Sequence, residues 1–264
     1  ALNVDTNEPW WEGLTDTIPG NIQDWQGNPW NPSSGPKAAH PNGRFTTSIY
    51  NTLRLSPEFD NPRGVPISAI IIGGRRTKTI PLTVESSDWV HGVFLGARNG
   101  SETTAAAAHQ EGVLRRDPMA MLPFCGYNMG DYLQHWINIG KKAKRPPKIY
   151  STNWFRVDEN GKFIWPGFGE NIRVLKWVID RVKGRASAKE TSIGLVPSYE
   201  DLTLEGLNFP KDKFEELFAI NKDEWAKEIT DIGEFFKTFG DRMPKAMWDE
   251  LGALGKRFGI STTK

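Results

Sequence analysis

The chain has 264 residues, which is enough for one large domain or two small ones with a hydrophobic core. Its formal net charge is +1, which excludes binding to nucleic acid or to an acidic membrane surface by bulk electrostatic attraction. A hydrophobic content of 38%, with 11 Trp and 14 Phe, indicates a globular protein and argues against disorder.

The single cysteine, Cys125, excludes a disulfide within the chain and favours a reducing, cytoplasmic setting. No apolar run approaches the roughly 18–20 residues of a membrane span, and no signal or transit peptide is visible. Because the sequence begins at Ala1 rather than with Met, we expect it to be part of a longer chain.

Residues 1–45 form a loop-rich lead-in with six prolines and four tryptophans. Such a segment cannot hold long helices, and we expect its tryptophans to pin it to a surface. Asn42 and Arg44 lie near its end, and from the residues alone Arg44 would be a surface cation.

The segment VPISAIIIGGRR follows at 65–76. Its β-branched run from Ile67 to Ile72 predicts a strand that is buried on both faces. Gly73 and Gly74 close the strand, and Arg75 and Arg76 stand at its carboxyl end, where ligands gather in α/β sheets. This arginine pair is either an anion site or a solvated charge pair in a turn.

A second strand is expected over 79–84, and Ser86 to Asp88 are candidates for the cap of a helix that contains Trp89 and Phe94. The next unusual stretch, 101–112, is rich in small residues. It is either a surface helix, since Ala is a strong helix former, or a lid that closes over a ligand. Its candidate lid residues are Ser101, Glu102, Thr103, Thr104, Ala105, Ala106, Ala107, Ala108 and His109.

A turn-rich connector, 116–124, precedes Cys125, which we predict to be a buried small apolar residue because nothing nearby in sequence would activate a thiolate. Asp131 is expected to cap a helix that runs to about Ile139. A strand at 149–152 then leads into the aromatic stretch that follows.

The stretch NWFRVDENGKFIWPGFGEN, 153–171, is the most informative part of the chain. Its Asn160-Gly161 pair predicts a hairpin, because both residues tolerate the positive φ of a tight turn. The aromatic residues are either core or a stacking surface for a purine base. Trp154 and Trp165 fit the core, whereas glycines on both sides of Phe168 disfavour packing there.

Beyond Gly184 the chain turns helical and charged, with two apolar stripes that indicate packing helices. Together the elements predict an α/β fold, with a mixed sheet flanked by helices and a helical carboxyl-terminal tail. No GxxxxGK[ST], HExxH or CxxC motif is present. The residues alone therefore indicate a nucleotide or anion binder rather than a self-sufficient enzyme.

Six segments, in this order and spacing, resemble the carboxyl-terminal half of GTP-dependent phosphoenolpyruvate carboxykinases: VPISAIIIGGRR, WVHGVFLGA, SETTAAA, DPMAMLPFCGYN, NWF and FIWPGFGEN. The resemblance covers nearly the whole chain. It implies part of the two-domain carboxykinase fold, with residues 46–264 as the carboxyl-terminal nucleotide-binding portion.

The resemblance also implies a reaction. Oxaloacetate is decarboxylated to an enolate, and the enolate takes the γ-phosphoryl group of GTP to give phosphoenolpyruvate, CO2 and GDP, in gluconeogenesis or anaplerosis. Mn2+ and Mg2+ would assist in the full enzyme. Their ligands, together with the phosphate loop, would lie upstream of Ala1, so the missing amino-terminal half is an expected partner of this chain.

By the same resemblance, Phe155, Phe163 and Phe168 would form a guanine pocket, and Asn171 would contribute backbone-level recognition of the base. Arg75 would reach the transferred phosphoryl group, and Arg44 with Asn42 would contact the substrate. The segment 101–112 would be an Ω-loop lid. This chain departs from the family pattern by having Cys125 in place of Phe, Leu122 in place of Arg and Ala108 in place of Glu.

Two further hypotheses remain open from the sequence. The chain could be a non-catalytic fragment that binds guanine nucleotides, because binding residues would be retained in both cases. It could also be a structural scaffold domain.

Overall fold

The computed structural model describes residues 1–44, 46–104 and 110–260. Contacts divide the chain into two units: residues 1–65 with 103–111, and residues 66–102 with 112–264. The first unit contains a four-stranded antiparallel sheet in the order β2-β1-β3-β4. Its strands are β1 (Leu2–Asn3), β2 (Glu8–Pro9), β3 (Ile22–Gln23) and β4 (Pro29–Trp30).

The first unit has a small core of its own. Trp10, Ile22 and Ala38 are buried, and the ring of Trp30 packs on that of Trp10 with centroids 5.8 Å apart. Its described helices are two single 3-10 turns, at Pro32–Ser34 and Ile49–Asn51. The prediction that the proline-rich start cannot hold long helices is thus confirmed for the described residues, and two of its tryptophans pack within the unit itself.

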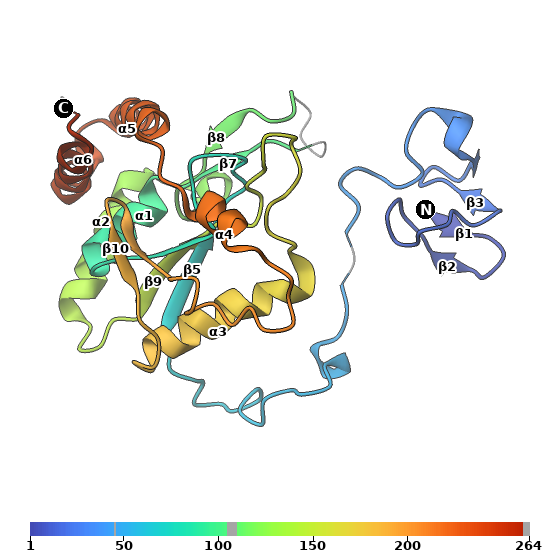
Figure 1. Cartoon of the computed structure of the whole chain (residues 1–264), viewed down its shortest axis with the longest axis horizontal. Coiled ribbons are helices and arrows are strands. Elements are labelled where there is room, and N and C mark those ends of the chain that lie inside the picture. The colour runs from blue at the N-terminus through green and yellow to red at the C-terminus, as the bar shows by residue number, and fades with distance from the viewer. Residues whose placement is uncertain (45, 105–109, 261–264) are drawn as a thin grey trace. The chain divides into compact units, whose positions relative to one another are not determined.

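The second unit is built on a five-stranded mixed sheet in the order β10-β11-β6-β9-β5 (Figure 1). Only β5 and β9 run parallel, and the remaining neighbours are antiparallel. The strands are β5 (Ala69–Gly73), β6 (Thr83–Glu85), β9 (Lys148–Thr152), β10 (Lys189–Thr191) and β11 (Gly194–Val196). A separate two-stranded ribbon pairs β7 (Gly100–Glu102) with β8 (Leu114–Arg116).

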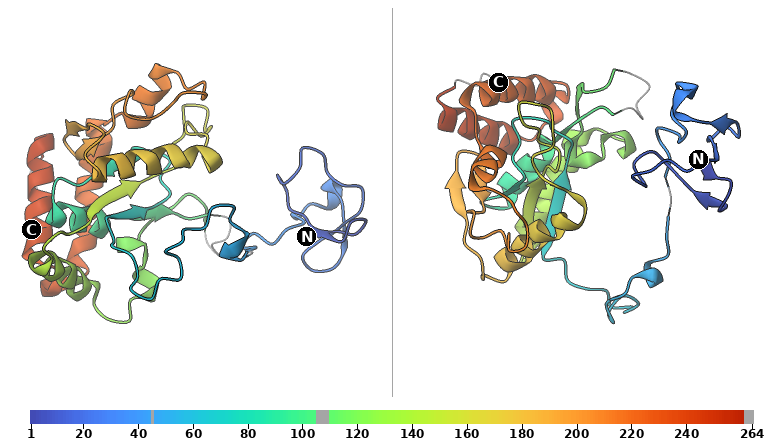
Figure 2. Two further views of the ribbon diagram at one scale, coloured as in Figure 1. Left: turned by 90° about the horizontal axis from the view of Figure 1, so that it is seen from below. Right: turned by 45° about the vertical axis from the view of Figure 1, so that its right-hand side comes forward.

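Helices cover both faces of this sheet. Figure 2 shows α1 (Trp89–Ala97) and α2 (Met129–Lys142) on one side and α3 (Asn171–Val182) on the other. Successive side chains of β9 point to opposite faces of the sheet, so this strand packs against helices on both sides. Ile149 packs closely on Gly92 of α1, whereas the centre of the Tyr150 ring lies 5.8 Å from that of Trp177 of α3. The remaining helices are α4 (Lys211–Phe218), α5 (Lys222–Lys237) and α6 (Lys245–Phe258).

The predicted fold class is confirmed, since the second unit is α/β with a mixed sheet and a helical carboxyl-terminal region. The apolar stripes of α5 and α6 do pack, and they join the core that also contains the buried face of α1. Among the described residues, no helix combines the length and the apolar character needed to cross a bilayer.

Several local predictions are wrong. The strand expected to be buried on both faces is β5, which lies at the edge of the described sheet, with Ile71 40% exposed and Ile67 70% exposed. A run of β-branched residues indicates a strand, but it does not indicate whether other strands pair with it on both sides. Cys125 is half-buried rather than buried, and its thiol approaches the Tyr127 carbonyl oxygen at 3.5 Å.

The caps were predicted with mixed success. Asp88 caps α1 as predicted, accepting a hydrogen bond from the His91 backbone N–H at 2.9 Å. The predicted cap of α2 at Asp131 is wrong, because Asn128 takes that role by accepting from the Gly130 N–H at 2.8 Å. Both residue types suit an N-cap. Asp131 lies instead in the first turn of the helix, where its carboxylate interacts favourably with the helix dipole.

Candidate functional site

The segment after β5 comes very close to the start of β7. A Cβ atom on Gly74 would stand 2.4 Å from the Gly100 carbonyl oxygen, so only glycine permits this approach. The Arg75 backbone N–H donates to Ser101 Oγ at 3.1 Å, and its carbonyl oxygen accepts from the Glu102 N–H at 2.8 Å. The main chain of Arg75 is therefore fixed by the first two residues of the predicted lid.

The Arg75 side chain lies against two of the predicted pocket phenylalanines. Its guanidinium carbon is 4.4 Å from the centre of the Phe155 ring and 5.8 Å from that of Phe163. The two rings meet edge to face, with centroids 6.0 Å apart. The structure thus brings together three of the candidate site residues in a cation–π cluster.

The neighbouring Arg76 has a different environment. It is buried and forms a bidentate ion pair with Glu228 of α5, at 2.9 and 2.6 Å. Arg116 also donates to Glu228, at 2.8 Å. Burial alone would raise the pKa of Glu228, but the hydrogen bonds and charges of the two arginines lower that pKa to about 2. Arg76 is therefore neither a free anion ligand nor a solvated charge.

Asn153 links the arginine segment to the aromatic one. Its Oδ1 atom accepts from the backbone N–H groups of Arg76, at 3.1 Å, and Phe155, at 3.2 Å. Its Nδ2 atom donates to the carbonyl oxygens of Arg76 and Ile80, both at 2.8 Å. The sequence analysis missed this role, although an Asn directly after the strand predicted at 149–152 was a usable signal, because its amide can satisfy several main-chain groups at once.

The predicted hairpin forms, with Val157 opposite Phe163. The Asp158 N–H donates to the Lys162 carbonyl oxygen at 2.9 Å and closes the turn. Gly161 takes the positive φ of the turn, at 75°, whereas Asn160 does not. The Asp158 carboxylate instead accepts from the Asn160 and Lys162 N–H groups, each at 3.0 Å.

The remaining aromatic residues separate as the sequence indicated. Trp165 is buried and Trp154 packs against the same core, whereas Phe168 is 95% exposed with a positive φ of 48°. A positive φ is unusual for a residue other than glycine and draws attention to this exposed ring. Asn171 begins α3, and its Oδ1 atom accepts from the indole N–H of Trp165 at 2.9 Å.

Other predicted residues lie in the first unit. Arg44 Nε donates to Asn42 Oδ1 at 3.4 Å, and both residues are exposed. Their contact with the substrate stays a prediction. In the lid segment, Thr103 Oγ1 donates to the Gln110 carbonyl oxygen at 2.6 Å, and Thr104 is exposed. The candidate lid residues outside the described part of the chain are Ala105, Ala106, Ala107, Ala108 and His109.

In the part of the chain that the structure describes, no three His, Cys, Asp or Glu residues lie close enough together to act as ligands of one metal ion. These residues do not fit Mn2+ or Mg2+, which prefer several oxygen ligands around one point.

Comparisons with known proteins give the family. The model of the phosphoenolpyruvate carboxykinase C-terminal P-loop domain matches residues 1–257. A phosphoenolpyruvate carboxykinase (GTP) of Anaeromyxobacter dehalogenans is 51% identical over 238 residues, which cover 90% of this chain and 40% of the relative. Its counterpart in Paenarthrobacter aurescens is 50% identical over 258 residues, or 97% of this chain and 42% of the relative. The chain thus spans about two fifths of the length of these relatives, and it belongs to the GTP-dependent phosphoenolpyruvate carboxykinase family.

Proposed function

We propose that the protein containing this chain interconverts oxaloacetate and GTP with phosphoenolpyruvate, CO2 and GDP. In this reaction the chain supplies the guanine pocket, the lid and arginines that contact the phosphoryl group and the substrate. The observation that carries the proposal is the cluster of Arg75 with Phe155 and Phe163, because it joins a forked cation to two aromatic rings in one place.

The guanine pocket would use the rings of Phe155, Phe163 and Phe168. The exposed Phe168 offers a free face for stacking, which contributes about 1–3 kcal/mol for each stacked base. The side-chain oxygen of Asn171 already accepts a hydrogen bond from the Trp165 indole N–H. The groups of Asn171 that remain free to recognise the base are therefore its side-chain NH2 and its backbone. This arrangement supports the proposed backbone-level recognition and adds an amide donor.

Arg75 would neutralise charge on the transferred phosphoryl group. Phosphoryl transfer depends mostly on positioning and on stabilising charge, and a planar guanidinium provides two parallel donors for phosphate oxygens. The contact of Arg75 with the Ser101 hydroxyl and the Glu102 N–H would tie the position of this arginine to the lid. Lid closure would then exclude water and protons from the enolate.

Asn42 and Arg44 would bind the oxaloacetate or phosphoenolpyruvate end of the site. An arginine beside an amide is suited to a carboxylate, since both groups donate hydrogen bonds. Mn2+ and Mg2+ would be bound by residues elsewhere in the whole protein, because the described residues of this chain do not fit them.

The test is an assay of the whole purified protein with oxaloacetate and either GTP or ATP. Formation of phosphoenolpyruvate and GDP that depends on GTP supports the proposal. Tight GTP binding without turnover, in the presence of Mn2+ and Mg2+, would instead support the non-catalytic guanine-nucleotide-binding alternative. Equal turnover with ATP would refute the guanine pocket.

A further inference from the structure

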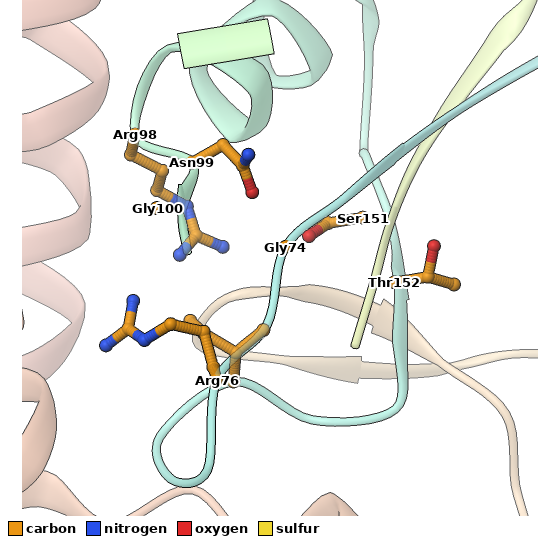
Figure 3. A pocket seen from close by; sticks show the side chains of 8 residues that line it. Gly74, Arg76, Arg98, Asn99, Gly100, Ser151 and Thr152 are labelled. Carbon is orange, nitrogen blue, oxygen red and sulfur yellow. The ribbon is translucent and has the colours of Figure 1, made fainter. Parts of the chain in front are cut away.

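A small cavity lies beneath the segment that leads to Arg75. It has a volume of about 10 Å³, and it is lined by residues at the ends of β5, β9 and α1 and at the start of β7 (Figure 3). A volume of this size holds about one water-sized particle. The lining residues are Gly74, Arg76, Ile80, Arg98, Asn99, Gly100, Ser151 and Thr152.

Arg98 is the unusual residue of this cavity. It is only 5% exposed, its Nε atom has no hydrogen-bond partner, and it forms no ion pair with any residue that the structure describes. Its guanidinium carbon lies 4.9 Å from the centre of the Trp225 ring and 6.0 Å from that of the Phe94 ring. Figure 3 shows the side chain running from the end of α1 toward the segment that carries Gly74 and Arg76.

The acidic side chains nearby are already bound to other arginines, so the positive charge of Arg98 has no paired carboxylate among the described residues. The nearby buried carboxylate, Glu228, already accepts hydrogen bonds from Arg76 and Arg116. Asp231 is bound to Arg116, and its side chain is 57% exposed to solvent. Three buried guanidinium groups therefore share one buried carboxylate. Burial is the largest of the influences that lower the pKa of Arg98, to about 10, so the group still carries its charge near neutral pH.

An unpaired buried cation is costly, and buried charges are normally paired. The carbonyl end of α1, which Arg98 caps, offsets only about half an elementary charge. A water molecule would satisfy a donor but would leave the charge in place. An anion would satisfy the donor and neutralise the charge together.

We propose that this cavity binds one small monovalent anion of about the size of chloride, held by the Arg98 guanidinium. The site is distinct from the phosphoryl-contacting position proposed for Arg75, because Arg75 does not line the cavity. It would be structural, fixing the end of α1 against the Gly74 segment. The proposal does not depend on the proposed reaction.

Crystals of the whole protein, grown or soaked in sodium bromide, test the occupant directly. We expect an anomalous-scattering peak from bromide in the cavity beside Arg98. Density that fits only a water molecule, with no anomalous signal, would overturn the proposal.

Thermal unfolding tests whether the ion stabilises the fold. At matched ionic strength, sodium chloride in place of sodium gluconate should raise the unfolding midpoint by about 2–4 °C. The rise should persist in Arg115→Met, which removes an arginine whose side chain is 57% exposed, and vanish in Arg98→Met. If Arg98→Met does not fold, the wild-type comparison and the bromide crystals still decide. A bromide peak without any chloride effect on the wild type would mean an adventitious ion only and would also overturn the proposal.

Discussion

The guanidinium of Arg75 lies over the ring of Phe155, 4.4 Å from its centre. The first residue is our candidate for contacting the phosphoryl group, and the second is a candidate wall of the base pocket. The phosphate end and the base end of a bound nucleotide would thus be bound by two side chains that are in contact with each other. Asn153 strengthens this link, because its Oδ1 atom holds the backbone N–H groups of Arg76 and Phe155 together.

Replacing Arg75 by Lys should lower turnover by about 10- to 100-fold, the range expected when a charge-assisted fork of hydrogen bonds is lost. Lys retains the charge and can still lie over Phe155, so the preference for GTP over ATP should stay unchanged. Steady-state kinetics with both nucleotides measure this, with Arg115→Lys as the exposed-arginine control. A loss of base preference would show that Arg75 reads the base.

Phe168→Ala should raise the KM for GTP by about 5- to 150-fold, which corresponds to losing about 1–3 kcal/mol of stacking. The KM for oxaloacetate should change little. Phe124→Ala is the matched control, because Phe124 is also a highly exposed phenylalanine of the same unit, at 83%. Similar increases for both substrates would refute the assignment of Phe168 to the base.

Much of this arrangement could be predicted from local sequence. The hairpin, the Asp88 cap and the division between a buried Trp165 and an exposed Phe168 follow from short-range preferences. The placement of Arg75 on the Phe155 ring could not be predicted in this way. These residues are far apart in the chain, and the parallel pairing of β5 with β9 brings them together.

The different environments of Arg75 and Arg76 could not be predicted from the sequence either. The two residues are adjacent and chemically identical, yet one contacts aromatic rings and the other is buried against Glu228. That difference depends on α5, which lies about 150 residues later in the chain. An edge strand such as β5 likewise cannot be recognised without knowing its neighbours.

Asn171 can be tested by separating its two roles. Asn171→Asp retains an oxygen for the Trp165 indole N–H but removes the amide donor, so stability should hold while the preference for guanine falls. Asn171→Ala should additionally lower the free energy of unfolding by about 1–3 kcal/mol, because a buried indole N–H loses its partner. Thermal unfolding and GTP/ATP competition measure the two effects. If the preference for guanine is unchanged in Asn171→Asp, the side-chain amide does not contact the base, and Asn171 would recognise the base through its backbone alone.

Glu228→Gln should be strongly destabilising, by about 3–5 kcal/mol, because it leaves Arg76 and Arg116 buried without their shared countercharge. Glu234→Gln on the same helix is the control, since its carboxylate is 66% exposed and pairs with Lys237 at the surface. Denaturant unfolding of the whole protein measures the difference. Equal effects of the two substitutions would contradict the buried network.

His91 should give the protein a distinct pH dependence. Burial, followed by the charges of Arg98 and Arg257, lowers the pKa of His91 from 6.5 to about 4. The folded state therefore disfavours the protonated ring, and the unfolded chain binds more protons between these two values. This contribution is fully present above pH 6.5 and is lost as the pH falls toward 4, by on the order of 3 kcal/mol.

The variant His91→Gln removes the titrating group, while its amide can still accept the hydrogen bond that His91 Nδ1 takes from the Ser87 N–H at 3.1 Å. Its unfolding midpoint should therefore vary less than that of the wild type between pH 6.5 and 4. The control is His135→Gln, because His135 lies exposed on α2. If the wild type and His91→Gln lose stability in parallel over this range, another group is responsible for the acid sensitivity.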